Sequence, residues 1–143
     1  MSYINSNTWE AYHDEFDYRY NQENCFEVDE NLVLCILELN KKGYKTKHCC
    51  SGHMFDRIST RFNGNKKMRS WNNECYISFD DKVDFKTLPE RFFKEVNNKY
   101  KTITIRKFYF SKEGTIERQK EIHETILDLY KWIESLEVIS NEL

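Results

Sequence analysis

The 143-residue sequence has one proline, four glycines, no Cys-x-x-Cys pair and no long apolar run. Scarce proline and glycine argue against disorder or low complexity over most of the chain. A membrane-spanning helix would need about 18 consecutive apolar residues, and none are present. The opening residues, MSYINSN, lack the basic and apolar regions of a secretory signal. The sequence therefore predicts a cytoplasmic protein with one globular domain and five reduced cysteines.

Aromatic side chains and uneven charge are what the chain has in excess. Aromatic residues make up 15% of it, and the formal net charge of −2 hides a strong asymmetry. Residues 1–30 carry eight acids and one base, whereas residues 41–69 carry nine Lys or Arg and one acid. An acidic, aromatic N-terminal arm over residues 1–27 is therefore expected to precede a basic middle. The alternative is that these charges cluster by chance on solvated faces.

Apolar spacing and turn residues predict the secondary structure. A short helix is expected within the arm, over residues 8–20. After it we expect a helix over 30–42 capped by Asp29 and closed by Gly43, a strand over 44–50, a long loop or irregular hairpin over 54–73 with its tip at Asn63-Gly64, a strand over 74–80, a helix over 89–99, a strand over 102–110 and a helix over 115–137. This order, α-β-β-α-β-α within residues 28–143, predicts a two-layer α+β domain whose three- to four-stranded sheet carries helices on one face.

Apolar side chains at helical and strand spacing predict the core. Its members are expected to be Leu32, Ile36, Ile77, Phe93, Ile103, Ile105, Ile126, Leu129 and Ile133. In the last helix the apolar residues recur at steps of four and three, a seam that packs either on the chain's own sheet or on a second copy. Because this helix is longer than a small sheet requires, we expect it to help form a homodimer.

The segment from Lys47 to His53 reads Lys-His-Cys-Cys-Ser-Gly-His and ends a predicted strand in the basic region. Backbone N–H groups of such a turn can hold a phosphate or carboxylate, because glycine permits close approach. Nearby arginines can pair with phosphate oxygens, and Trp71, Phe79 or Tyr109 can stack on a base. The expected ligand-binding residues are Cys50, Ser51, Gly52, His53, Arg57, Arg61, Arg69, Trp71, Arg106 and Tyr109. The alternative is a plain turn with the aromatic side chains in the core.

Metal binding is the first of two other readings of this segment. His48, Cys49, Cys50 and His53 have spacings that a zinc site tolerates, but successive side chains of a strand point to opposite faces. The remaining cysteines have no neighbouring His or Cys. We therefore expect no bound metal and no cofactor.

Nucleophilic catalysis is the other reading, with the Cys50 thiolate as nucleophile and His53 or His48 as base. A carboxylate that would orient the base cannot be chosen among Asp56, Asp80 and Asp81. The set is incomplete, so no catalytic residue is assigned.

The run NKKGYKTKHCCSGH from Asn40 to His53, followed by YISF from Tyr76, resembles a family of small uncharacterised proteins of bacteriophages and Gram-positive bacteria. This resemblance covers roughly residues 30–80. Cys-Ser-Gly is also similar to the SCSGR motif of wybutosine-synthesising tRNA methyltransferases, with His53 in place of the arginine, but no methyl-donor site can be matched elsewhere. The first resemblance implies a phage origin, hence the host cytoplasm and a role in host takeover or defence evasion. It implies no reaction.

Three functions follow from these observations. The first is a non-enzymatic binder of a nucleotide or nucleic-acid phosphate, for example an anti-defence protein acting by sequestration or occlusion. The second is a small RNA- or nucleotide-modifying enzyme that uses Cys50 and His53. The third is an inhibitor of a host defence protein whose acidic arm mimics nucleic acid.

Overall fold

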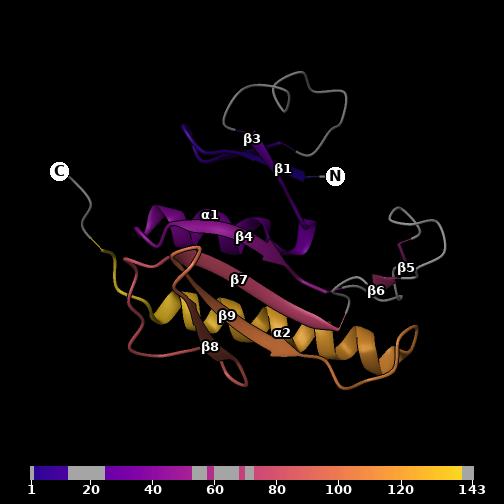
Figure 1. The fold of residues 1–143 in the computed structure, drawn as a ribbon. Coiled ribbons are helices and arrows are strands. Elements are labelled where there is room, and N and C mark those ends of the chain that lie inside the picture. Colours follow the sequence, from indigo (N-terminus) through magenta and orange to yellow (C-terminus); the bar gives the residue numbers. More distant parts are fainter. Residues whose placement is uncertain (1, 13–24, 53–57, 60–67, 70–72, 140–143) are drawn as a thin grey trace.

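The computed structural model describes residues 2–12, 25–52, 58–59, 68–69 and 73–139 (Figure 1). Its elements, in chain order, are β1 (Ser2–Asn5), β2 (Glu10–Tyr12), β3 (Cys25–Val28), the 3-10 helix η2 (Glu30–Leu32), α1 (Val33–Lys41), β4 (Thr46–Cys50), β5 (Ile58–Ser59), β6 (Met68–Arg69), β7 (Glu74–Asp80), β8 (Phe93–Asn97), β9 (Thr102–Phe108) and α2 (Ile116–Ser135). The chain is α+β, as predicted. The order of the elements is not the predicted one, because strand β8 replaces the helix expected between β7 and β9 and strands β1, β2 and β3 precede α1.

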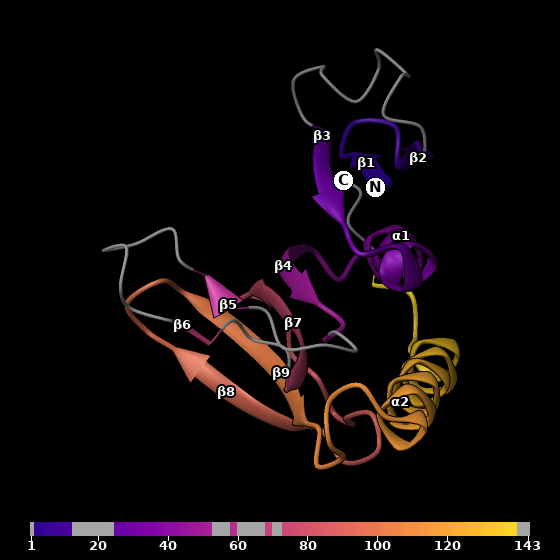
Figure 2. The same ribbon diagram turned by 90° about the vertical axis from the view of Figure 1, so that its right-hand side faces the viewer.

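Four antiparallel strands form the main sheet, in the order β4-β7-β9-β8. Both α1 and α2 lie on the same side of this sheet (Figure 2). Its opposite side, called the open face below, has neither helix on it. A small sheet of order β2-β1-β3 contacts α1 on the side away from the main sheet. No helix in the described part of the chain is long and apolar enough to cross a membrane.

Alternation along β7 and β9 explains why these segments form the centre of the main sheet. Both were expected as strands, and they pair along their whole length, from Glu74 opposite Phe108 to Asp80 opposite Thr102. Their β-branched and aromatic residues suit a pleated surface. Every second residue is buried beneath the helices, and Ile77 and Ile105 are fully buried. This alternation also decides which side chains reach the open face.

The helix predicted over residues 89–99 is wrong, because residues 93–97 form the edge strand β8. It pairs with β9 through a short hairpin whose turn is held by Asn97, since the side-chain oxygen of Asn97 accepts hydrogen bonds from the N–H groups of Lys99 and Tyr100. Pairing with a strong strand has overridden a weak helical pattern. Phe93 is the single predicted core residue that is not buried, with 37% of its surface exposed.

Part of the N-terminal arm is built into a small sheet. Residues 10–12 are strand β2, which pairs with β1, and residues 13–20 of the predicted helix lie outside the described residues. Ile4 of β1 is fully buried. The small sheet therefore extends the hydrophobic core beyond α1.

The predicted helix over residues 30–42 is present as η2 and α1. Asp29 has the extended backbone of an N-cap residue, but its side chain makes no capping hydrogen bond. Its carboxylate instead accepts hydrogen bonds from Ser51, far along the sequence. Asp29 therefore stands at the predicted N-cap position, but its side chain has a tertiary role in place of a capping one.

The long helix α2 begins at Thr115, whose hydroxyl accepts a hydrogen bond from the N–H of Arg118 at 3.1 Å. Its seam residues Ile126, Leu129 and Ile133 are buried within the chain. These three residues pack within the chain, and the homodimer expected from this helix stays a prediction. At the other end, the Lys42 ammonium donates to the carbonyls of residues 133 and 136 at 2.7 and 3.0 Å, which satisfies acceptors that a helix terminus leaves open.

The basic segment after β4 contains the short pair β5 and β6, which are antiparallel with Ile58 opposite Arg69. This pairing agrees with the irregular hairpin expected over residues 54–73. Its predicted tip at Asn63-Gly64 lies outside the described residues.

Candidate functional site

The open face carries an ordered row of side chains across all four strands of the main sheet. Register places directly paired residues side by side, and in one such row they are Cys50 of β4, Tyr76 of β7, Arg106 of β9 and Phe93 of β8. This set is called the central row below. Three strand spacings separate its ends, a span of about 14 Å. The row is long enough to contact more than one small chemical group.

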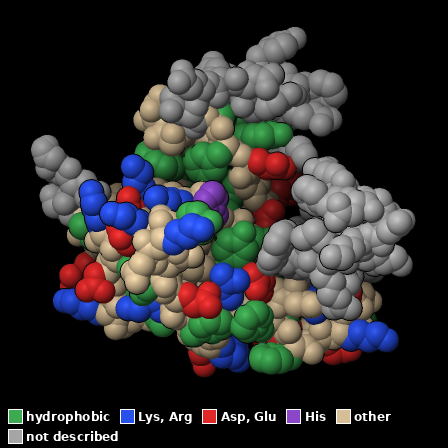
Figure 3. Space-filling model, viewed as in Figure 1, with side chains coloured by type: hydrophobic (Ala, Val, Ile, Leu, Met, Phe, Trp, Pro, Cys, Tyr) green, Lys and Arg blue, Asp and Glu red, His purple; other side chains and the backbone are tan. Residues whose placement is uncertain are grey.

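Aromatic rings flank the central arginine on both sides. The guanidinium carbon of Arg106 lies 5.4 Å from the centre of the Tyr76 ring. On the other side, the rings of Phe93 and Phe108 have centroids 5.5 Å apart and are tilted by 33°. Phe108 is 46% exposed. Figure 3 views this face and shows hydrophobic side chains next to acidic and basic ones over the sheet. The open face thus offers flat apolar surface around a charged centre.

Two carboxylates hold Arg106 in place. Its Nη1 donates to Glu74 Oε1 at 2.6 Å, and its Nε lies 2.9 Å from Glu95 Oε1. The Nε–H is buried and does not point so as to donate a hydrogen bond to Glu95. The contact between Nε and Glu95 Oε1 is therefore an ion pair defined by its distance alone. The three groups together carry one net negative charge. A phosphate would therefore find little attraction at Arg106 itself, and this centre is better suited to neutral polar groups.

The Cys-Ser-Gly turn adjoins one end of the central row and is tightly built. Ser51 is buried, and its N–H and hydroxyl donate to Asp29 Oδ2 at 2.8 and 3.0 Å. The Tyr109 hydroxyl donates to the Ser51 carbonyl at 2.5 Å. Gly52 has a φ of +84°, and its N–H donates to Cys50 Sγ at 3.5 Å. The Ser51 N–H that was expected to hold an anion is therefore satisfied by an internal carboxylate.

Removing the Asp29 carboxylate should destabilise this turn. We expect Asp29→Ala to lower the free energy of unfolding by about 2–3 kcal/mol, because two charge-assisted hydrogen bonds are lost and the Ser51 donors stay buried. Asp29→Asn, which keeps an acceptor oxygen, should recover roughly half of the loss. Urea unfolding followed by circular dichroism measures both. An unchanged midpoint in Asp29→Ala would show that the contact contributes nothing.

Tyr109, expected to stack on a ligand, instead supports the turn from inside. It is 5% exposed, because the alternation of β9 directs residue 109 toward the same side as Ile103 and Ile105. The charged ends of Lys107 and Arg118 lie 5.1 and 5.3 Å from its ring centre. Burial raises the pKa of its phenol, which stays protonated as a donor. Phe79, the other stacking candidate in the described part, is also fully buried.

Glu121 accepts hydrogen bonds where the chain leaves β9. Its carboxylate accepts from the N–H groups of Phe110 and Ser111 and from the Ser111 hydroxyl. Burial acts to raise the pKa of Glu121, but these hydrogen bonds and the charge of Lys107 outweigh it and lower that pKa. Lys107 donates to the Thr125 hydroxyl at 2.5 Å, and burial lowers its pKa. The Glu121 carboxylate thus already binds the backbone N–H groups at this end of the sheet.

Burial raises the pKa of three of the cysteine thiols. Burial raises the pKa of Cys49 to about 12, and the Cys35 thiol is raised to about 12 for the same reason. Cys75 is fully buried and its pKa is raised well above the usual value. These three are core groups rather than nucleophiles. Within the described residues no group of three or more His, Cys, Asp or Glu side chains is placed to hold a metal ion.

The structure brings together five of the residues expected to bind a ligand. Cys50 and Arg106 are in the central row, whereas Ser51, Gly52 and Tyr109 form the turn that adjoins it. For Arg69 the backbone alone is described, in β6. The remaining candidates, His53, Arg57, Arg61 and Trp71, lie outside the described residues.

Sequence reasoning missed the other members of the open face. They include Glu74, Tyr76, Phe93, Glu95 and Phe108. The signal was available for β7 and β9, since residues that alternate with Ile77 and Ile105 must face the opposite side. For β8 this alternation was not considered, because a helix was predicted over residues 89–99.

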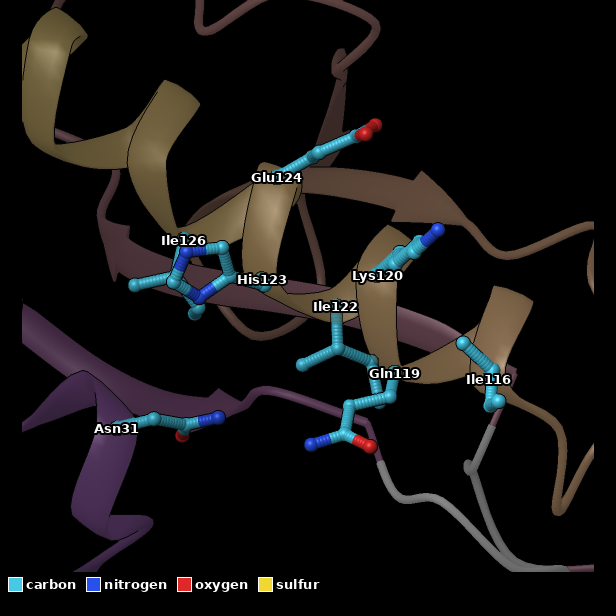
Figure 4. A pocket seen from close by; sticks show the side chains of 8 residues that line it. All are labelled: Asn31, Ile116, Gln119, Lys120, Ile122, His123, Glu124 and Ile126. Carbon is cyan, nitrogen blue, oxygen red and sulfur yellow. The ribbon is translucent and has the colours of Figure 1, made fainter.

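A separate groove of about 580 Å³ lies between η2 and α2. In it Asn31 faces Gln119 and Ile122 across the opening (Figure 4). Its lining combines isoleucines with mixed charges, and none of the residues expected from the sequence to bind a ligand is among them. The open face and its adjoining turn are therefore the stronger candidate site.

No protein-family model, no curated protein and no solved structure matches the chain.

Proposed function

We propose that the chain binds single-stranded nucleic acid, or a nucleotide, on the open face, with bases against the aromatic side chains. The observation that carries this proposal is the central row, in which Tyr76 and Phe93 stand on either side of Arg106 on a sheet face without a helix. Bases stack on exposed aromatic rings regardless of sequence, and single-strand binders commonly use such sheets. In a phage setting, this binding would act by sequestration or occlusion.

The phosphates would lie toward β4 and the basic segment rather than at Arg106. Lys45, just before β4, and Lys47 and His48 within it are exposed at the edge of the main sheet. The basic segment leaves this edge after Gly52 and returns to β7 at Asn73. Cationic side chains at the edge of the sheet and aromatic rings nearer its centre match a ligand whose negative charge lies on its phosphate backbone.

Truncating a ring of the open face should weaken binding. We expect Phe108→Ala to raise the dissociation constant for a fluorescein-labelled dT12 oligonucleotide about tenfold, because one base–aromatic contact contributes about 1–3 kcal/mol. Fluorescence anisotropy at several salt concentrations measures this. Affinity should also fall as salt rises, since binding to phosphates releases counterions.

Phe110→Ala is the matched control. Phe110 is 89% exposed, lies just beyond the end of β9 and is not part of the Phe93–Phe108 ring pair. Its removal should leave both affinity and melting temperature unchanged. Equal affinities of wild type, Phe108→Ala and Phe110→Ala, or the absence of any binding, would contradict the proposal.

A further inference from the structure

The two carboxylates that hold Arg106 differ in access to solvent. The side chain of Glu74 is 9% exposed, whereas that of Glu95 is 52% exposed. Glu95 is close to the guanidinium through Oε1 alone, and an ionised carboxylate has about four acceptor positions on its two oxygens. Glu95 therefore keeps free acceptor capacity on the open face, and Glu74 is largely closed to a ligand.

Glu95 also stands next to the rings that would stack a base. It is two residues from Phe93 on β8, so both side chains point to the open face and their Cα atoms are about 7 Å apart. Phe93 in turn contacts Phe108. A base lying on these rings would extend its hydrogen-bonding edge toward the Glu95 carboxylate. The opposite neighbour, Thr104, is buried and already bonded to the Ser78 hydroxyl at 2.7 Å, whereas the Glu95 side chain is exposed.

We propose that Glu95 is a specificity-determining residue that selects guanine, an inference that rests on the proposed binding of bases to the open face. Guanine presents two neighbouring donors, N1–H and the exocyclic amino group, on its Watson–Crick edge. These match the two oxygens of one carboxylate, and hydrogen bonds to an ionised acceptor are about twice as strong as neutral ones.

The other bases lack this pair of donors. Adenine and cytosine each place a ring acceptor beside their amino group, which would repel a carboxylate oxygen. Thymine and uracil have a single N–H between two carbonyl acceptors. Glu95 therefore favours guanine by attraction and disfavours the alternatives by repulsion between acceptors.

The experiment compares fluorescein-labelled dT9 with dT9 oligonucleotides whose central base is guanine, adenine, cytosine or hypoxanthine. Anisotropy titrations use the full chain as wild type, Glu95→Gln and Glu90→Gln. Glu90 is an exposed acid before β8 and outside it, so it controls for the loss of one negative charge. We expect wild type and Glu90→Gln to bind the guanine oligonucleotide about tenfold more tightly than dT9, the typical discrimination of one bidentate contact. Hypoxanthine, which lacks the exocyclic amino group, should be intermediate.

In Glu95→Gln the preference for guanine should disappear while binding to dT9 persists or tightens, since one negative charge is gone. Equal affinity of wild type for all five oligonucleotides would overturn the role of Glu95 but leave the proposed function standing. A guanine preference that survives in Glu95→Gln would also overturn it. Absence of binding to every oligonucleotide would overturn the proposed function and this inference together. Melting curves of the three proteins should coincide, and a large drop in Glu95→Gln alone would assign Glu95 a structural role instead.

Discussion

Gly52→Ala is expected to lower the free energy of unfolding by about 3 kcal/mol, from two causes that act at the same atom. An alanine at a φ of +84° carries backbone strain of about 1–2 kcal/mol. Its Cβ would also lie 2.3 Å from Tyr109 Cε2 and 3.0 Å from the Glu74 carbonyl oxygen. Overpacking of this kind costs about 1–3 kcal/mol. In a chain of this size the melting temperature should fall by about 10 °C.

The Tyr109 ring cannot easily move out of the way. Its hydroxyl is bonded to the Ser51 carbonyl, and its backbone N–H donates to the carbonyl of Asn73 at 2.7 Å. Gly114→Ala provides the control, because Gly114 has a φ of +72° but lies in an exposed turn. It should lose only the strain, about 1–2 kcal/mol. Equal losses in the two variants, measured by thermal and urea unfolding, would show that Tyr109 yields freely.

Arg118→Ala should have an effect of similar size. Arg118 is 1% exposed on α2, and its Nη2 donates to Asn73 Oδ1 at 2.9 Å and to the Ser111 carbonyl at 2.6 Å. Its guanidinium also lies against the ring of Tyr109. Truncation removes charge-assisted hydrogen bonds and leaves a cavity, so we expect a loss of about 3 kcal/mol or more.

Arg91→Ala is the matched control for this change. Arg91 pairs with Asp128 of α2 at 3.0 Å, but its side chain is 54% exposed. An exposed ion pair of this kind contributes about 1 kcal/mol or less. If Arg91→Ala destabilised the chain as much as Arg118→Ala, burial would not be what makes Arg118 important. Chemical denaturation of the two variants beside wild type makes this comparison.

Gly52→Ala and Arg118→Ala both test the packing around Tyr109, from opposite sides of its ring. Gly52 and Ser51 pack on one edge of the ring, and Arg118 lies over its face. The tyrosine therefore connects the turn after β4 to α2. If this connection positions the candidate site, both variants should weaken oligonucleotide binding under conditions where they are still folded.

The sequence predicted the turn but not how the turn is used. Ser-Gly at the end of an alternating strand marks a turn by local chemistry alone, since glycine tolerates positive φ and β4 has alternating character. Asp29, in contrast, looked like a helix cap because its position before an apolar run fits that role. Its bond to Ser51 joins residues 22 apart, a pairing that no local pattern contains.

Tyr109 lies on the buried side that the alternation of β9 indicates. Ile103 and Ile105 mark the buried side of β9, and an uninterrupted alternation places Tyr109 with them and Arg106 on the opposite side. The sequence therefore already separated a supporting tyrosine from an exposed arginine. It did not indicate that Tyr76 and Phe93 would stand beside that arginine, because strand order and register depend on contacts between distant segments.

The sequence by itself determined the α+β class, the helices α1 and α2, the strands β4, β7 and β9, and the burial of eight of the nine residues expected in the core. Each of these depends on spacing and turn residues within a short window, where local physical preferences suffice. Tertiary structure alone decided that residues 93–97 are a strand and that the arm forms a second sheet. It also decided that four strands align one row of side chains on the open face, because hydrogen bonding between strands, rather than propensity within them, sets which residues become neighbours.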